Sequence, residues 1–360
     1  MGPEHPRPEA APGTDVAPAD PEPALAPGAP LSAGLRCAHR LLAEAGIASA
    51  RVDAELLAAH LLADAEGRAP GRGEVAAGAI TGRFTVPAGY AELIRRRAAR
   101  EPLQHLTGRA PFRRLELLVG PGVFVPRPET EVLVDEVSAH LAARRAEAQG
   151  SEASGSEPPG SESAPDPAPL VVDLATGSGA LALAVAQENP GTRVIGVERS
   201  ETALAWAERN ARRVAREHGV RIDLRREDAR DALPGAEGTV EAIVTNPPYI
   251  PEDAVPRDPE VARYDPPEAL YGGSPDGLAI PTAFLERAAR LLRPGGLLVM
   301  EHAEVQAGAV AALFRDRGFH RVRNVRDLTG RDRATAGLAP GYPGERAESA
   351  HPRDERASAP

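Results

Sequence analysis

The chain has 360 residues, of which 42% are apolar and 3% are aromatic, and its formal net charge at pH 7 is −10. This acidic balance argues against non-specific nucleic-acid binding, which depends on neutralising phosphates with basic side chains. The single cysteine, Cys37, excludes a disulfide framework and a cysteine-based zinc site, and no apolar run approaches the roughly 20 residues of a membrane-spanning helix. We therefore expect a cytoplasmic protein of two or three domains, and we assign no metal ligand.

The two ends of the chain and one internal segment lack the large apolar side chains that a core needs. Residues 1–30, 149–169 and 339–360 are instead rich in small, polar or acidic residues and in proline. Such segments cannot bury enough surface to offset the entropy that ordering costs. We therefore expect two disordered tails and a disordered insert.

Residues 31–108 carry apolar side chains at helical spacing, as in the segments that begin at Leu31, Asp53 and Tyr90. This pattern predicts a small helical domain. A linker follows at residues 109–130, and within it residues 112–125 alternate apolar and polar side chains around Gly120-Pro121-Gly122. We interpret this linker as a β-hairpin that connects two domains.

In residues 131–338, short apolar runs that predict strands alternate with helical segments. We expect strands at residues 170–174, 194–198, 221–225, 242–245 and 296–301, and helices at residues 180–187, 201–217 and 282–292. The alternation predicts an α/β fold in which helices cover both faces of a parallel sheet. Ligands of such sheets bind beyond the carboxyl ends of the strands, so this region holds the candidate active site.

A glycine-rich loop follows the first of these strands, in the run Asp173-Leu-Ala-Thr-Gly177-Ser-Gly179. Its glycines allow a sharp turn and a close approach of the backbone to a ligand. Glu198 ends the next strand about twenty residues later, where a carboxylate can accept both hydroxyls of a ribose. Because Gly177, Gly179 and Ala182 also satisfy the dinucleotide fingerprint, the loop fits a nicotinamide enzyme, an S-adenosylmethionine enzyme, or a tight turn without a ligand.

The most informative motif is Asn246-Pro247-Pro248-Tyr249, directly after the strand at residues 242–245. The prolines end the strand and fix the backbone, so that the Asn246 side chain and a proline carbonyl become two converging acceptors. Two acceptors suit a planar NH2 group, on which a neighbouring aromatic ring can pack. The motif therefore predicts a site for a carboxamide or for the exocyclic amino group of a base, and the alternative is an ordinary proline-rich turn.

Such a site suits methyl transfer to nitrogen. An amide nitrogen is a poor nucleophile, and accepting both of its hydrogens draws electron density onto it. Orientation against a sulfonium methyl group lowers the barrier, and the acceptor hydrogen bonds strengthen as positive charge develops on nitrogen. No strong general base is needed, because the methylated product loses its proton easily.

The sequence resembles the bacterial glutamine methyltransferases that modify peptide chain release factors, over most of residues 31–337. Asn-Pro-Pro-Tyr by itself is shared with methyltransferases that act on adenine in DNA, but the order and spacing of the other motifs are specific. These motifs lie at residues 101–108 (EPLQHLTG), 124–131 (FVPRPETE), 173–179, 246–250, 268–278 and 293–301.

The resemblance implies a seven-stranded Rossmann-like sheet, S-adenosylmethionine as methyl donor, and the glutamine of the Gly-Gly-Gln loop in class 1 release factors as acceptor. It implies a catalytic motif of Asn246, Pro247, Pro248 and Tyr249, in which Asn246 and Pro247 bind the glutamine amide and Tyr249 packs on it. The helical domain would bind the release factor, and we expect a monomer that contacts neither nucleic acid nor membrane. The residues implied to bind the donor are Asp173, Ala175, Thr176, Gly177, Ser178, Gly179, Glu198, Asp228 and Ala229.

Ala175 departs from the family pattern, in which many members have glycine at this position. A methyl group at this position is tolerated only if φ is negative, so the alanine bears on the affinity for the donor. Three other functions compete with the release-factor reading. They are methylation of a ribosomal-protein glutamine or of adenine in DNA, a nicotinamide-dependent oxidoreductase, and a binding module without catalysis.

Overall fold

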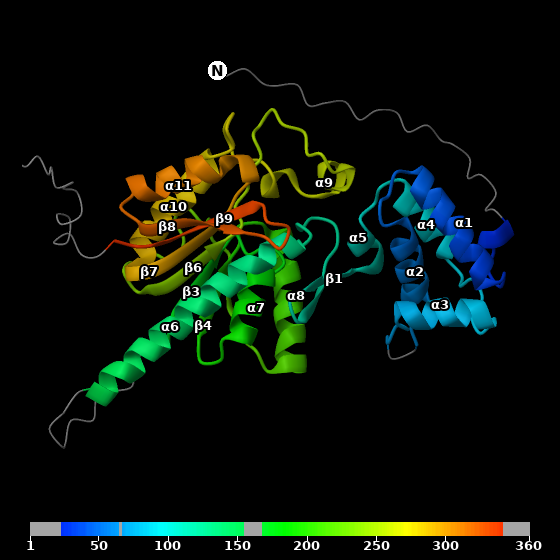
Figure 1. The fold of residues 1–360 in the computed structure, drawn as a ribbon, viewed down its shortest axis with the longest axis horizontal. Helices are drawn as coiled ribbons and strands as arrows, with labels where there is room; N and C mark the ends of the chain where they lie inside the picture. Colours follow the sequence, from blue (N-terminus) through cyan, green and yellow to red (C-terminus); the bar gives the residue numbers. More distant parts are fainter. Residues whose placement is uncertain (1–22, 65–66, 155–167, 341–360) are drawn as a thin grey trace, which may run out of the picture. The chain divides into compact units, whose positions relative to one another are not determined.

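The computed structural model describes residues 23–64, 67–154 and 168–340. The chain divides into two compact units, and the boundary lies between Thr107 and Gly108. Figure 1 shows the first unit as helices alone and the second as a sheet between helices. None of the helices that the structure describes is long and apolar enough to span a membrane.

The first unit consists of α-helices around one apolar core, in which Leu31, Leu42, Leu57 and Ile94 are fully buried. The Tyr90 hydroxyl donates a hydrogen bond to the carbonyl oxygen of Ala54 at 2.9 Å, which joins two of the helices. The helices at residues 72–81 and 103–107 were not located individually from the sequence, and the first of them carries only a weak apolar pattern. The helices are α1 (Leu31–Glu44), α2 (Ala50–Leu61), α3 (Arg72–Thr81), α4 (Tyr90–Ala98) and α5 (Leu103–Thr107).

The expected N-terminal tail is too long by eight residues within the described chain. A short 3-10 helix, η1 (Pro23–Leu25), places Leu25 in the core of the first unit, where it is 3% exposed. Gly28 N–H donates to the Val86 carbonyl at 2.9 Å, so this segment pairs with backbone that lies far along the chain. The composition of residues 23–30 favours disorder, but the burial of Leu25 and the backbone hydrogen bond of Gly28 fix this segment on the first unit. Residues 1–22 lie outside the described residues.

The second unit begins with a hairpin of β1 (Arg109–Phe112) and β2 (Leu115–Leu118). Its turn is at residues 113–114, where Arg113 has a φ of +54°. The expectation that the hairpin turns around Gly120-Pro121-Gly122 is therefore wrong. These residues follow β2, and Gly120 lies against Trp206, whose ring would be 2.6 Å from a Cβ at this position. A glycine is needed there for close packing rather than for a turn.

A 3-10 turn, η2 (Pro128–Glu131), leads into the long helix α6 (Val132–Ser154). The helix continues through residues 149–154, which we expected to belong to the disordered insert, and residues 155–167 lie outside the described residues. At the other end of the unit, Ala339 is buried and exchanges backbone hydrogen bonds with Gly295 and Gly296. The expected C-terminal tail therefore begins no earlier than residue 341, and residues 341–360 are also outside the described part.

The expected seven-stranded α/β sheet is confirmed, with strand order β5-β4-β3-β6-β7-β9-β8. The first five strands in this order are parallel, and β9 is antiparallel to both of its neighbours. The sequence did not locate β8 and β9, and β7 begins four residues before its expected start. The strands are β3 (Leu170–Leu174), β4 (Arg193–Val197), β5 (Asp223–Arg225), β6 (Val240–Thr245), β7 (Leu292–Glu301), β8 (His320–Arg326) and β9 (Asp332–Leu338).

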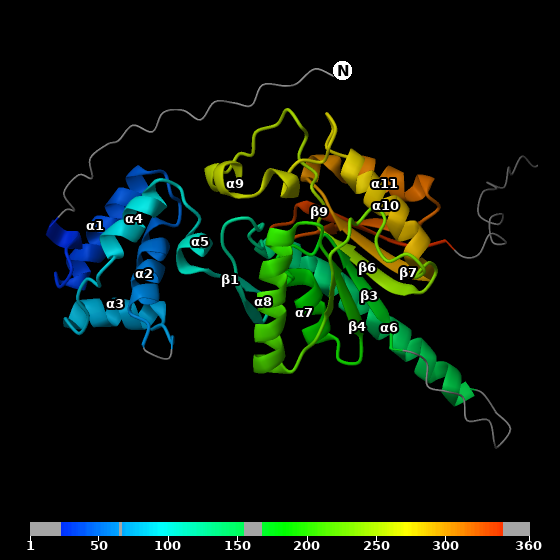
Figure 2. The same cartoon turned by 180° about the vertical axis from the view of Figure 1, so that it is seen from behind.

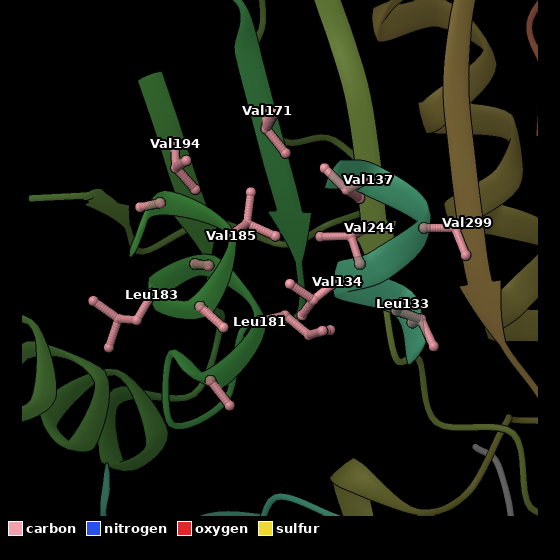
Figure 3. Close-up of a cluster of buried hydrophobic side chains, with 14 of the residues drawn as sticks. Leu133, Val134, Val137, Val171, Leu181, Leu183, Val185, Val194, Val244 and Val299 are labelled. Atoms are coloured by element: carbon pink, nitrogen blue, oxygen red, sulfur yellow. The ribbon is translucent and has the colours of Figure 1, made fainter. Parts of the chain in front are cut away.

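Helices cover both faces of the sheet (Figures 1 and 2). On one face, α6 and α7 (Ala180–Glu188) contribute Leu133, Val137, Leu181 and Val185 to a core shared with the central strands, as Figure 3 shows. On the other face, α10 (Ala279–Leu291) and α11 (Ala307–Asp316) pack on a second core around Phe284 and Phe314. Another helix, α8 (Glu201–His218), follows β4, and the short elements α9 (Pro259–Tyr264), η3 (Pro267–Ala269) and η4 (Glu304–Gln306) complete the unit.

The chain order creates a switch point beside the central strand β3. From β3 the chain moves outward to β4 and β5, and it then returns to place β6 on the other side of β3. The carboxyl ends of β3, β4 and β6 therefore lie side by side, which is where open α/β sheets bind ligands.

Candidate active site

A cavity of about 520 Å³ lies within the second unit at the carboxyl ends of β3, β4 and β6. Its walls come from the loops after these strands, from the loop after β5 and from residues 122–130. The volume falls within the range of small-molecule sites. Of the predicted site residues, those that line this cavity are Ala175, Thr176, Gly177, Ser178, Glu198, Asp228, Ala229, Asn246, Pro248 and Tyr249.

Asp173, near the end of β3, binds the glycine-rich loop through its side chain. It is not among the residues that line the cavity. Its Oδ2 accepts hydrogen bonds from the Thr176 hydroxyl at 2.5 Å and from the Ala182 N–H at 3.1 Å, and the residue is wholly buried. Burial raises the pKa of Asp173 to about 7, because the charged form loses its hydration. Asp173 therefore fixes the conformation of the loop, and a contact between Asp173 and the donor stays a prediction. Gly179, with a φ of +84°, is the N-cap of α7 and is also absent from the walls.

Ala175 has a φ of +63°, outside the negative range in which a methyl group is tolerated without strain. A residue with a Cβ in the left-handed region carries roughly 1 to 2 kcal/mol of strain. The loop keeps this conformation because Asp173 and the sheet fix both of its ends, and Thr176 N–H donates to the Val197 carbonyl at 2.8 Å. The site therefore stores strain at Ala175.

Glu198 is the first residue after β4 and is 8% exposed. Its Oε2 accepts a hydrogen bond from the Gly177 N–H at 2.9 Å, and its Oε1 accepts one from the Ser200 N–H at 2.8 Å. Each carboxylate oxygen keeps a further lone pair, which suits two neighbouring hydroxyl donors. Burial raises the pKa of Glu198 against the opposing effect of these backbone donors.

Asp228 and Ala229 form the cavity wall after β5. The Arg230 guanidinium donates to both oxygens of Asp228, at 2.9 and 2.6 Å, and it holds the pKa of that carboxyl at about 2. Asp228 is therefore ionised at neutral pH. Ala229 is 5% exposed and offers an apolar surface beside it.

The Asn-Pro-Pro-Tyr segment leaves β6 at the cavity. The Asn246 amide group Nδ2 lies 3.4 Å from the Thr130 hydroxyl oxygen, and the Tyr249 hydroxyl donates to Glu301 Oε1 at 3.1 Å. Burial and the neighbouring Glu301 carboxylate raise the pKa of Tyr249, so its phenol is neutral. Pro247 is buried and is not among the lining residues, whereas Pro248 is.

Two glycines, Gly277 and Gly272, pack closely beside the main chain of Tyr249. Gly277 has a φ of +73°, and a Cβ there would overlap the carbonyl oxygen of Tyr249. Gly272 in turn packs against Gly277, because a Cβ at Gly272 would overlap the carbonyl oxygen of Gly277. The Gln306 side chain completes the support by donating from Nε2 to the carbonyl oxygens of Tyr249 and Asp276, at 2.9 and 2.8 Å.

Several cavity residues were not predicted as site residues. Thr130 and Glu301 lie within the motifs at residues 124–131 and 293–301, so the sequence carried a signal for them. Arg127 also comes from the first of these motifs, and it pairs with the buried carboxylate of Asp265 at 2.8 Å. Arg333, on β9, had no local signal. Within the described ranges, no group of three or more acidic, His or Cys side chains is placed to hold a metal ion.

Comparisons with known proteins agree with this architecture. A family model described as a methyltransferase domain matches residues 166–328. The release factor glutamine methyltransferase of Streptomyces coelicolor is 45% identical over 83% of this chain and 95% of its own length. That of Bifidobacterium longum is 41% identical over 81% of this chain and 94% of its own.

Two further matches are a relative that is named for a different acceptor and a solved structure. A 4-amino-L-phenylalanine/4-methylamino-L-phenylalanine methyltransferase of Streptomyces pristinaespiralis is 40% identical over 77% of this chain and 84% of its own. A solved structure of the release-factor-specific protein-(glutamine-N5) methyltransferase of Alicyclobacillus acidocaldarius is 30% identical, with a TM-score of 0.31, over 62% of this chain and 98% of its own. The curated relatives match along nearly their whole length, and the chain belongs to the family of release factor glutamine methyltransferases.

Proposed function

We propose that this chain transfers the methyl group of S-adenosylmethionine to the side-chain amide nitrogen of the glutamine in the Gly-Gly-Gln loop of class 1 release factors. The observation that carries the proposal is that Asn246 and Glu198 line one cavity. Glu198 suits the ribose of the methyl donor and Asn246 suits a primary amide, so the methyl donor and the acceptor amide would lie in the same cavity. The names of the curated relatives support the same reaction.

The residues present fit S-adenosylmethionine. Glu198 would accept the ribose hydroxyls through its remaining lone pairs, and Asp228 with Ala229 would contact the adenine. A Cβ at Gly177 would meet nothing within 4 Å, so the backbone of the loop stays accessible to the methionine part of the donor. When bound, the donor supplies an electrophilic sulfonium methyl group.

The residues of the acceptor side would bind and orient the glutamine amide. Asn246 Oδ1 and the Pro247 carbonyl would accept its two hydrogens, while the Tyr249 ring packs on its plane. These acceptors draw electron density onto the nitrogen, and their hydrogen bonds strengthen as that nitrogen becomes positive. Because the neutral Tyr249 phenol is itself a donor to Glu301, we assign it no role as a base.

We also propose that the helical first unit binds the release factor and that the enzyme is a monomer. The motif at residues 101–108 supports the first of these assignments. A second acceptor class deserves a direct comparison, because one relative is named for an aromatic amine, which also presents a planar NH2 group.

The test is transfer of a labelled methyl group from S-adenosylmethionine. The acceptors are a purified class 1 release factor, the same factor with its loop glutamine replaced by alanine, and free 4-amino-L-phenylalanine. We expect label only in the intact release factor, at the loop glutamine. Label in the alanine variant or in the aromatic amine would contradict the proposed acceptor. The Asn246→Ala enzyme provides the blank.

A further inference from the structure

A chain of buried polar groups lies behind the Asn246 side chain. Thr130, in η2, is 5% exposed and stands between Asn246 and Glu301, which ends β7 and is 3% exposed. The Thr130 hydroxyl oxygen lies 3.4 Å from Asn246 Nδ2. Burial raises the pKa of the Glu301 carboxyl, and the Thr130 hydroxyl opposes that rise by favouring the ionised form. Three elements that are distant in sequence thus meet at one threonine.

One carboxylate oxygen of Glu301 lacks a hydrogen-bond donor with good geometry among the described residues. Its Oε1 accepts from the Tyr249 hydroxyl at 3.1 Å, but its Oε2 is buried without a well-aligned donor among the described residues. A buried carboxylate oxygen without a donor is energetically costly, because the hydration that it loses on burial is not replaced. The Thr130 hydroxyl can rotate its single hydrogen toward this oxygen, which accepts that hydrogen whenever the Glu301 carboxyl is ionised.

This direction of the Thr130 hydrogen decides the orientation of the Asn246 amide. A hydroxyl that donates to Glu301 can only accept from Asn246, so Asn246 must turn its NH2 group toward Thr130. Its Oδ1 then points the other way, as an acceptor for the cavity. The opposite orientation would direct two NH2 groups, one from Asn246 and one from the substrate, at each other.

We propose that Thr130 and Glu301 are positioning residues that fix the Asn246 amide with its oxygen toward the substrate NH2 group. This inference rests on the proposed function and explains how one rotamer of an amide, whose two ends are almost isosteric, is selected. Neither residue needs to touch the substrate in order to act, since both act through Asn246.

The experiment compares Thr130→Val, which removes the hydroxyl at nearly constant volume, with Thr130→Ser, which keeps it. For Thr130→Val we expect the turnover number to fall about 10- to 100-fold while the KM for S-adenosylmethionine stays within about 2-fold. For Thr130→Ser we expect activity within about 3-fold of the wild type. Equal losses in both variants would indicate packing and overturn the proposal, as would an active Thr130→Val enzyme.

A second readout does not depend on the acceptor. The sequence has four asparagines, so selective ¹⁵N-asparagine labelling of the full chain gives four side-chain NH2 signals. Asn246→Asp identifies the signal of Asn246. We expect Thr130→Val to move that signal, and Thr130→Ser to leave it near its wild-type position. An unmoved signal in Thr130→Val would overturn the inference even if the release factor proved to be the true acceptor.

The matched control is Thr335→Val, which removes another buried threonine hydroxyl. Thr335 lies on β9, and its hydroxyl oxygen is 3.0 Å from His302 Nε2 and 3.2 Å from Asn324 Oδ1. We expect this variant to shift the Asn324 signal and to leave both the Asn246 signal and the turnover number unchanged. If wild-type enzyme fails to methylate the release factor, the proposed function fails, and the Asn246 signal still decides the positioning proposal.

Discussion

Glu198 Oε2 accepts a hydrogen bond from the Gly177 N–H at 2.9 Å, so one carboxylate joins the end of β4 to the loop that follows β3. The same carboxylate is the group that we expect to bind the ribose. Its hydrogen bond to the loop therefore couples the shape of the glycine-rich turn to the binding of the donor.

Replacing Glu198 by alanine should weaken the binding of S-adenosylmethionine. The loss of hydrogen bonds to a charged group predicts a decrease of about 1.5 to 3 kcal/mol in binding free energy. Isothermal titration calorimetry measures the change, with Glu201→Ala as control because Glu201 is exposed and lies outside the cavity walls. Equal affinities for Glu198→Ala and the control would remove Glu198 from the site.

Replacing Ala175 by glycine should stabilise the fold. Glycine tolerates the observed φ of +63°, and the relief of strain exceeds the greater flexibility of glycine in the unfolded chain. We expect the free energy of unfolding to rise by about 0.5 to 1 kcal/mol, measured by urea denaturation. Ala184→Gly, within the helix α7, should instead lower it by about 1 kcal/mol. A fall of similar size in both variants would exclude strain at Ala175.

The stability of the ligand-free protein should depend on Asp173 between about pH 4 and 7. The pKa of Asp173 in the fold is raised to about 7, whereas the unfolded chain loses this proton near pH 4. Between these values the folded state binds more protons, so the contribution of Asp173 to stability decreases as pH rises, and it levels off above about pH 7. In Asp173→Asn this slope should disappear, as unfolding free energies at several pH values would show. Parallel curves for the two proteins would contradict the assignment.

The ring of Tyr249 should matter more than its hydroxyl. Tyr249→Phe keeps the ring and loses the hydroxyl that bonds to Glu301, so we expect the transfer rate to stay within about 5-fold of the wild type. Tyr249→Ala removes the surface on which we propose that the amide packs, and we expect a loss of more than about 10-fold. Single-turnover rates at saturating donor measure both. A Phe variant as slow as the Ala variant would assign the essential role to the hydroxyl.

The sequence predicted those features that depend on strand ends. Gly177, Glu198 and Asn246 each follow a strand, and parallel strands in a switch-point sheet bring their carboxyl ends together. What the sequence missed depends on long-range pairing or on local backbone without a glycine. Arg333 reaches the cavity only because β9 inserts between β7 and β8, and the hairpin turns at Arg113 without a turn residue to mark it.

Gly277 and Gly272 pack so closely against main chain beside Tyr249 that neither position accepts a side chain. Any side chain at either position would collide with main chain rather than with a movable side chain, so no neighbouring substitution can compensate for it. In a library of random variants selected for growth or activity, these two codons should stay invariant although neither residue touches the reacting atoms. The position of the Tyr249 main chain thus depends on two residues that have no side chain.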